Sequence, residues 1–166
     1  MKKRLIIGMY LMVFVCSCER ETDNPPDKAL AVSLNASNEI VQGEQFTVSI
    51  EVKNADSLFA ISFELHYDST LFKTDTIIAG DLFMDPYLAS NPIFLSDGEV
   101  PVAIGEDVDS IQKSASGTAC SIIFTSESRG TDILYISSLH LIKKNGNDID
   151  GFNMLSVESI EVQIAP

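Results

Sequence analysis

Apolar and polar residues alternate along most of the chain after residue 29. The clearest stretches are residues 46–52 (Phe-Thr-Val-Ser-Ile-Glu-Val) and 61–67 (Ile-Ser-Phe-Glu-Leu-His-Tyr), in which every second side chain is apolar. A period of two is typical of a β-strand with one face in a core and the other in water. Ser62, Glu64 and His66 are therefore predicted to point outward. Weaker alternation predicts six more strands, over residues 29–35, 71–78, 100–104, 118–125, 133–142 and 158–164.

The segments between these strands are rich in turn-forming residues. Examples are residues 42–44 (Gln-Gly-Glu), 97–98 (Asp-Gly) and 145–147 (Asn-Gly-Asn), and glycine and asparagine accept the backbone angles of tight turns. No window has a sustained helical period. Many short strands at this spacing predict an all-β fold, a β-sandwich or jelly roll, with one domain over residues 29–166.

The first 28 residues have a different character. Three basic residues precede an eleven-residue apolar run, and residues 15–18 (Val-Cys-Ser-Cys) are small residues that end at a cysteine. This order is typical of a secretory signal, and the run is too short to span a bilayer, which takes about 20 residues. The ending resembles the lipobox of bacterial lipoproteins, in which the cysteine becomes the acylated N-terminus. We therefore expect a signal peptide over residues 1–17, lipidation at Cys18 and a polar tether over residues 18–28; an ordinary secretory peptide cleaved nearby is the alternative.

The charge balance bears on the choice of partner. The chain has 24 acidic and 11 basic residues, and three of the basic ones lie in the signal segment, so the exported part is strongly acidic. A nucleic-acid partner is not expected, because phosphates demand a basic patch. The chain also has no polybasic segment for anionic lipids. Membrane attachment, at the bacterial outer membrane or cell surface, would come from the acyl chains on Cys18.

Motifs for catalysis or zinc binding are missing from the sequence. It has no Gly-x-Ser-x-Gly, no His-Glu-x-x-His and no Cys-x-x-Cys, which would mark a nucleophile elbow or a zinc site. The two histidines, His66 and His140, lie on predicted strands. Cys120 alternates with Ile122 and Phe124 and is predicted to be a buried thiol. We expect neither an enzyme, nor a resident metal, nor a cofactor.

Acidic clusters and aromatic residues offer two further candidates for binding. Residues 106–109 (Glu-Asp-Val-Asp) and 147–151 (Asn-Asp-Ile-Asp-Gly) carry the oxygen ligands that calcium prefers, but neither has the spacing of a calcium loop. We interpret them as solvated loop acids. The chain has no Trp, and Tyr67 alternates with the apolar set, so it is predicted to lie in the core. Tyr87, in an irregular segment with two prolines, is a candidate for stacking on a sugar.

Five segments, taken in order, resemble the cohesin family. They are residues 42–48, residues 58–68 with the following Leu71, residues 79–83, residues 117–124 and residues 139–147. The matched region covers about residues 30–164. Cohesins bind dockerin modules and so gather polysaccharide-degrading enzymes on scaffolds or cell surfaces. The resemblance implies a nine-stranded jelly roll, shared with certain carbohydrate-binding modules, and a dockerin-like protein partner. Gly80 is expected to supply a backbone angle that other residues resist.

The resemblance also implies a binding face. In the best-known cohesins, an Asn and an Asp on the outward side of the strand before a Tyr-Asp turn contact the dockerin. Counting back from the Tyr-Asp turn at residues 67–68, Ala60 and Ser62 occupy those two positions. Glu64 and His66 continue the same face. We expect these four residues to bind the partner, through contacts that differ from those of the best-known cohesins.

The predicted function is therefore a non-catalytic, lipid-anchored, cohesin-like binding module at the bacterial envelope. Its partner would be a dockerin-like or other protein in polysaccharide degradation. The alternative is a surface lipoprotein that binds glycan, or polysaccharide, through its loops and Tyr87. A structural envelope component without a separable ligand, and a small glycosidase, are further alternatives that composition leaves open.

Overall fold

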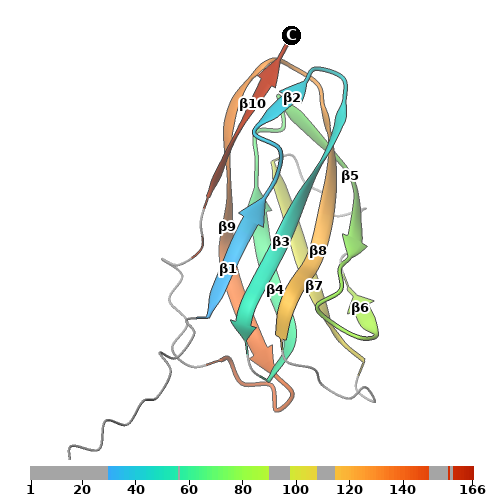
Figure 1. Cartoon of the computed structure of the whole chain (residues 1–166), viewed down its shortest axis with the longest axis vertical. Helices are drawn as coiled ribbons and strands as arrows, with labels where there is room; N and C mark the ends of the chain where they lie inside the picture. The colour runs from blue at the N-terminus through green and yellow to red at the C-terminus, as the bar shows by residue number, and fades with distance from the viewer. Residues whose placement is uncertain (1–29, 56, 90–97, 108–114, 150–156, 158) are drawn as a thin grey trace, which may run out of the picture.

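The protein is all-β over the part of the chain that the structure describes. The computed structural model describes residues 30–55, 57–89, 98–107, 115–149, 157 and 159–166, and these residues form strands and connecting turns without a helix (Figure 1). The strands are β1 (Ala31–Asn35), β2 (Glu39–Val41), β3 (Gln45–Ala55), β4 (Leu58–His66), β5 (Phe72–Ala79), β6 (Pro86–Leu88), β7 (Glu99–Glu106), β8 (Ala115–Ser126), β9 (Gly130–Lys143) and β10 (Ile160–Ala165).

The strands form two sheets that pack face to face. One sheet has four strands in the order β1-β3-β8-β5, and the other has six in the order β2-β10-β9-β4-β7-β6. Figure 1 looks onto the four-stranded sheet, with β4, β7 and β9 behind it. The described pairs are antiparallel except for β2 with β10, which are parallel. This is the jelly-roll sandwich that the alternation and the cohesin resemblance predict.

All eight strands predicted from alternation are present. Two more, β2 and β6, have three residues each and lie at the two edges of the six-stranded sheet. The described residues thus contain ten strands, where the resemblance implies nine. Three residues are too few to show a period of two, which is why the pattern did not reveal these edge strands.

The core lies between the sheets and is built from the inward side of every long strand. An aromatic cluster occupies one part of it: Phe124 lies 5.4 Å from Phe46 and 5.1 Å from Tyr67 between ring centroids, and Phe72 lies 5.1 Å from Phe46. Tyr67 is half-buried and packs against this core, on the side that its alternation with the apolar residues predicts. Cys120 is also buried, and this burial raises the pKa of its thiol to about 12. It is an inert apolar residue, as its alternation suggested.

The turn after β4 is closed by Asp68. Its Oδ1 accepts hydrogen bonds from the Thr70 backbone N–H at 2.8 Å and the Thr70 hydroxyl at 2.7 Å. The hydroxyl bond and then the N–H bond hold the pKa of the Asp68 carboxyl below its ordinary value. The predicted role of Gly80 needs a correction. Its φ is not positive, and it is required because a Cβ there would lie 2.1 Å from the Thr118 carbonyl oxygen.

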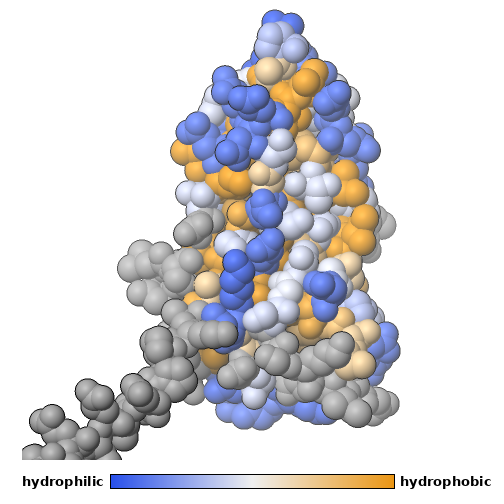
Figure 2. All heavy atoms as spheres, in the orientation of Figure 1, coloured by the Kyte–Doolittle hydropathy of each residue, from blue (hydrophilic) through white to orange (hydrophobic). Residues whose placement is uncertain are grey.

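The outward face of the four-stranded sheet carries polar side chains that hydrogen-bond to one another, beside an exposed Ile78 on β5. Ser49 and Ser121 share a hydrogen bond of 3.2 Å between β3 and β8. Asp75 on β5 accepts hydrogen bonds from Thr125 at 2.5 Å and Gln45 at 2.9 Å. Figure 2 shows this side of the molecule, with hydrophilic residues running down its middle and hydrophobic patches on either side.

The segment of residues 1–29, which contains Cys18 and the expected tether, lies outside the described residues. Among those that the structure describes, no helix is long and apolar enough to cross a membrane.

Candidate functional site

The four residues predicted to bind a partner lie in one row on the outward side of β4. Ala60, Ser62, Glu64 and His66 are half-buried, and they alternate with buried residues of the core. Their strand lies inside the six-stranded sheet, between β9 and β7. The structure confirms that Ser62, Glu64 and His66 point outward, as the alternation predicts. Ala60, whose place in the row comes from the cohesin resemblance, lies on the same side, and the sheet order puts the row at the middle of that face.

The register of the sheet gives each of these residues two neighbours. Ala60 lies between Ile142 on β9 and Gly105 on β7, and Gly105 in turn pairs with Tyr87 on β6. This row therefore places two residues with little or no side chain between two large ones. Such a row leaves a depression in the outward face of the sheet.

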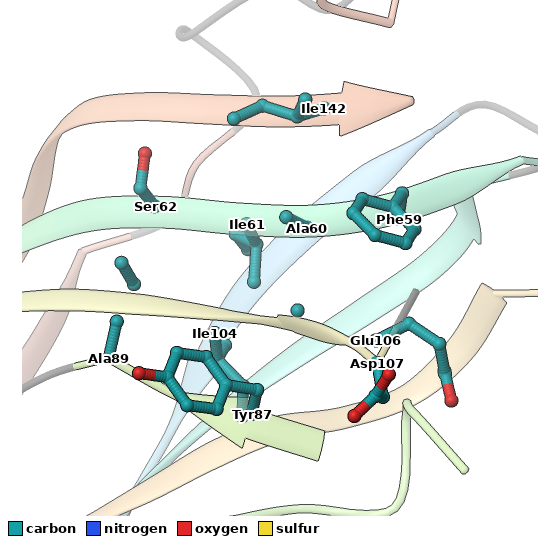
Figure 3. Close-up of a pocket in the computed structure, with 12 residues that line it drawn as sticks. Phe59, Ala60, Ile61, Ser62, Tyr87, Ala89, Ile104, Glu106, Asp107 and Ile142 are labelled. Atoms are coloured by element: carbon teal, nitrogen blue, oxygen red, sulfur yellow. The ribbon is translucent and has the colours of Figure 1, made fainter. Parts of the chain in front are cut away.

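A hollow of about 430 Å³ occupies this position (Figure 3). Its lining includes three residues with little or no side chain, Ala60, Ala103 and Gly105. The larger side chains of Phe59 and Tyr87 stand on either side of it in Figure 3. The remaining lining residues are Ile61, Ser62, Ala89, Ile104, Glu106, Asp107 and Ile142. Most of these side chains are apolar, so the hollow suits an apolar group rather than an ion.

A β-bulge on β4 contributes Phe59 to the hollow. Leu58 pairs with Lys143 and Ala60 with Ile142, so β4 advances by two residues where β9 advances by one. The extra residue, Phe59, is therefore outside the alternation and joins the outward side. The predicted strand began at residue 61, so the sequence pattern did not place Phe59 in the site.

Glu106 fixes the wall of the hollow that carries Tyr87. Its carboxylate accepts hydrogen bonds from the Met84 backbone N–H at 3.1 and 3.0 Å and from the Asp85 N–H at 2.9 Å. Glu106 is 8% exposed, whereas Tyr87, two residues beyond Asp85, is 70% exposed. The interpretation of residues 106–109 as solvated loop acids is therefore wrong for Glu106. Its carboxylate is buried and satisfied by backbone donors, while residues 108 and 109 lie outside the described residues.

The other end of the same face is polar. His66 Nε2 lies 2.6 Å from the Ser137 hydroxyl, which also donates to Glu64 Oε2 at 3.2 Å, and the Ser138 hydroxyl donates to the same oxygen at 2.8 Å. The His66 ring stacks on Tyr135, with centroids 4.7 Å apart and planes 13° apart. This end thus has an organised set of polar groups with fixed orientations.

A second bulge, on β9, creates this arrangement. Ser62 pairs with His140 and Glu64 with Ser137, so β9 has one more residue than β4 between these pairs. Ser138 lies in this stretch and has a positive φ of 50°. As a result two serine hydroxyls, rather than one, reach Glu64. The alternation within a single strand contains no signal for this feature.

Glu99 joins the polar end from β7, where it pairs with His66. One potential ligand atom from each of Glu64, His66 and Glu99 lies within 4.8 Å of the other two, and all three side chains are half-buried. The sequence predicts no metal, and its pattern contains no signal for Glu99. His140, the other histidine, lies 3.6 Å from Asp148 at the surface; residues 150 and 151 of that acidic cluster are outside the described residues.

Comparison with known proteins identifies the family. The family model for the cohesin domain matches residues 30–146, well over half of the chain. The chain belongs to the cohesin family. Cohesin domains are non-catalytic modules for protein interaction, so this cohesin is a protein-binding module and not an enzyme. Among curated proteins, none has a sequence that matches this chain.

Solved structures agree with the family assignment. A type II cohesin module from the adaptor scaffoldin ScaA of Acetivibrio cellulolyticus has a TM-score of 0.69 at 15% identity, with 84% of this chain and 92% of that chain covered. The third cohesin of ScaC from the same organism, solved in complex with the ScaB dockerin, has 0.68 at 17%, with 83% and 100% covered. A cohesin module from a Clostridium perfringens family 33 glycoside hydrolase has 0.67 at 13%, with 81% and 96% covered. At these identities the likeness shows the shared fold.

Proposed function

We propose that this cohesin is a lipid-anchored receptor at the bacterial envelope, and that it holds a dockerin-like module of a protein involved in polysaccharide degradation. The partner would lie on the outward face formed by β9, β4, β7 and β6. One observation carries the proposal: this face combines an apolar hollow over Ala60, Ala103 and Gly105 with a polar end around Glu64 and His66.

This combination suits a protein partner. Protein interfaces typically have a desolvated apolar centre, into which a large side chain of the partner inserts, and a polar surround that fixes orientation. The hollow is large enough for such a side chain. The hydroxyl of Ser62 and the groups around Glu64 lie next to it along β4 and would provide the polar contacts.

The residues that differ from those of the best-known cohesins suit a face that still binds a partner, but through different contacts. Ala60 and Ser62 stand where those cohesins have an Asn and an Asp, so two polar contacts are missing. The same change opens the hollow, because Ala60 adds only a methyl group beside Gly105. We therefore infer that the partner contacts this position with an apolar side chain, whose burial stabilises the complex.

The test is a pull-down from the organism's secreted and envelope proteins, with residues 27–166 as bait, in calcium and in a calcium chelator. Dockerins need calcium to fold, so a captured dockerin-bearing enzyme should be lost in the chelator. Capture of no such protein under either condition would contradict the dockerin assignment. The family membership would then describe the fold alone.

A glycan is the second candidate, and Tyr87 favours it. This ring is 70% exposed and stands at the side of the hollow, where it could stack on a sugar. The glycan hypothesis predicts that soluble oligosaccharides bind without any protein present and that Tyr87→Ala abolishes this binding. Titration calorimetry with oligosaccharides of the organism's habitat separates it from the dockerin hypothesis.

The lipid anchor is tested separately. We expect the full-length chain, expressed in a bacterium supplied with an alkyne-labelled fatty acid, to incorporate the label and to sediment with membranes. Cys18→Ala should abolish both results, because the acyl chains would be the membrane attachment. Labelling that persists in Cys18→Ala would contradict the predicted acylation site.

A further inference from the structure

The polar end of the β4 face is organised around three side chains that are familiar metal ligands. Glu64 and His66 come from β4, two residues apart on one side of the strand, and Glu99 comes from the neighbouring strand, opposite His66. Their ligand atoms lie within 4.8 Å of one another. We infer that Glu64, His66 and Glu99 form a binding site for a divalent transition-metal ion, with Zn²⁺ as the ion that suits them best.

The chemistry of the donors selects the ion. One imidazole nitrogen and two carboxylate oxygens form a ligand set that zinc accepts, with bonds of about 2.0–2.2 Å. Ligand atoms around a tetrahedral zinc ion then lie about 3.3 Å apart, which small side-chain rotations reach from the separations here. Calcium is a poorer fit, because it takes six to eight oxygen ligands and disfavours nitrogen.

The strands hold the ligands in place. β4 and β7 pair without a register shift from Ala60 to His66, so His66 and Glu99 are fixed opposite each other on adjacent strands. Ligands on two paired strands need little reorganisation to close on an ion, which favours binding. Two carboxylates so close together also repel each other, and a dication between them would remove this repulsion.

Contacts outside the trio orient the ligands as they do in known zinc sites. A ligating histidine usually donates its second ring N–H to an oxygen, which fixes its tautomer and orientation. The Ser137 hydroxyl lies 2.6 Å from His66 Nε2 and donates to Glu64 at 3.2 Å. In the tautomer in which Nε2–H donates to Ser137, Nδ1 has the lone pair that a metal requires. Stacking on Tyr135 holds the ring plane.

The site does not depend on the identity of the partner. It lies on the same face as the hollow but has no residue in common with the hollow's lining. Three protein ligands leave at least one position of the ion for water or for a group from a bound molecule. Zinc binding can therefore be measured on the protein alone, whether or not a dockerin is its partner.

The experiment is a calorimetric titration of the purified protein, without a histidine tag, with ZnCl₂. We expect one ion per chain. His66→Gln and Glu99→Gln should each weaken binding by roughly tenfold or more, since each removes a ligand or replaces it with a weaker one. His140→Gln is the matched control and should leave the affinity unchanged, because the His140–Asp148 pair supplies only two donors. Thermal unfolding verifies that each variant is folded.

Two further variants separate an organised site from loose surface binding. Ser137→Ala should weaken zinc binding about tenfold, and Ser137→Thr, which keeps the hydroxyl, should restore it. Tyrosine emission, which is readable because the chain has no Trp, should change on zinc addition and lose this change in Tyr135→Phe but not in Tyr87→Phe. Absence of zinc binding, or binding that His66→Gln leaves intact, would overturn the proposal.

Discussion

Both outward faces of the sandwich are built from every second residue of their strands, but they differ in the space that they offer to a partner. On the four-stranded sheet, polar side chains bond to each other, as Ser49 does to Ser121 and Thr125 to Asp75. On the six-stranded sheet, polar side chains also bond to each other around Glu64, but Ala60 and Gly105 leave a hollow beside them. Alternation thus accounts for the outward residues of the regular strands, whereas side-chain size and register, including the bulges at Phe59 and Ser138, decide which face has room for a partner.

The largest effect on the difference between the two faces is expected from a charge placed in the hollow. Ala60→Asp should weaken binding of the partner captured in the pull-down by about 100-fold, since a carboxylate would be desolvated where an apolar side chain now fits. Ala31→Asp makes the same change on the outward side of β1 in the other sheet and should leave the affinity unchanged. Calorimetry or surface plasmon resonance measures both. Equal losses in the two variants would show that the hollow has no special role.

The next largest effect is expected from Glu106, whose hydrogen bonds hold the segment that leads to Tyr87 beside the hollow. Glu106→Gln should lower the free energy of unfolding by about 1–3 kcal/mol, because the buried acceptor of the Met84 and Asp85 N–H groups loses its charge and one of its oxygens. Urea unfolding measures this change. Glu161→Gln, at an exposed acid on β10, is the control and should cost less than about 0.5 kcal/mol. If the two variants were equally stable, Glu106 would not be the structural support.

A smaller effect is expected on the four-stranded sheet. Ser121→Ala removes the hydrogen bond to Ser49 and should lower the free energy of unfolding by about 0.5–1.5 kcal/mol. Partner binding should not change, because Ser121 lies on the sheet opposite the proposed interface. A loss of binding in Ser121→Ala with the fold intact would move the interface, or part of it, to the four-stranded sheet.

The smallest effect concerns the turn at Asp68, which joins β4 to β5 and so links the two sheets. The pKa of the Asp68 carboxyl lies below 3.8, its ordinary value, in the folded state because of its bonds with Thr70. Its stabilising contribution is therefore present above pH 3.8 and is lost as the pH falls through the lowered pKa. Asp68→Asn should lower the melting temperature slightly at pH 7, and this difference from the wild type should shrink as the pH falls below 3.8. Thr70→Val, which removes the hydroxyl donor, should show the same trend more weakly.

Much of the fold could be predicted from the sequence, and less of the site. Strong alternation predicts the long strands and the outward side of Ser62, Glu64 and His66, because one buried face imposes a period of two. The hollow could not be predicted, because Ala60, Ala103 and Gly105 come from two strands whose register the sequence does not state. The position of Glu99 beside His66 could not be predicted for the same reason.

The two β-bulges are also features that the alternation of apolar and polar residues does not predict. Phe59 and Ser138 reach the outward face through register shifts between β4 and β9, and a single strand's alternation has no information on its partner's spacing. The prediction of a solvated loop acid is wrong for Glu106 because this residue lies at the end of β7, where the sequence pattern does not distinguish a buried acid from a solvated one. Its partners are backbone N–H groups, which no residue pattern reveals.

The short edge strands affect how the protein behaves where many copies lie close together. The six-stranded sheet ends in β2 and β6, each of three residues, and β6 begins with Pro86, which has no N–H to offer. The four-stranded sheet ends in β1, of five residues, and in β5, which has a register shift at Thr74 and an exposed Lys73. Short, irregular or charged edges are poor templates for another strand. Many copies packed together at high local concentration would therefore resist edge-to-edge aggregation.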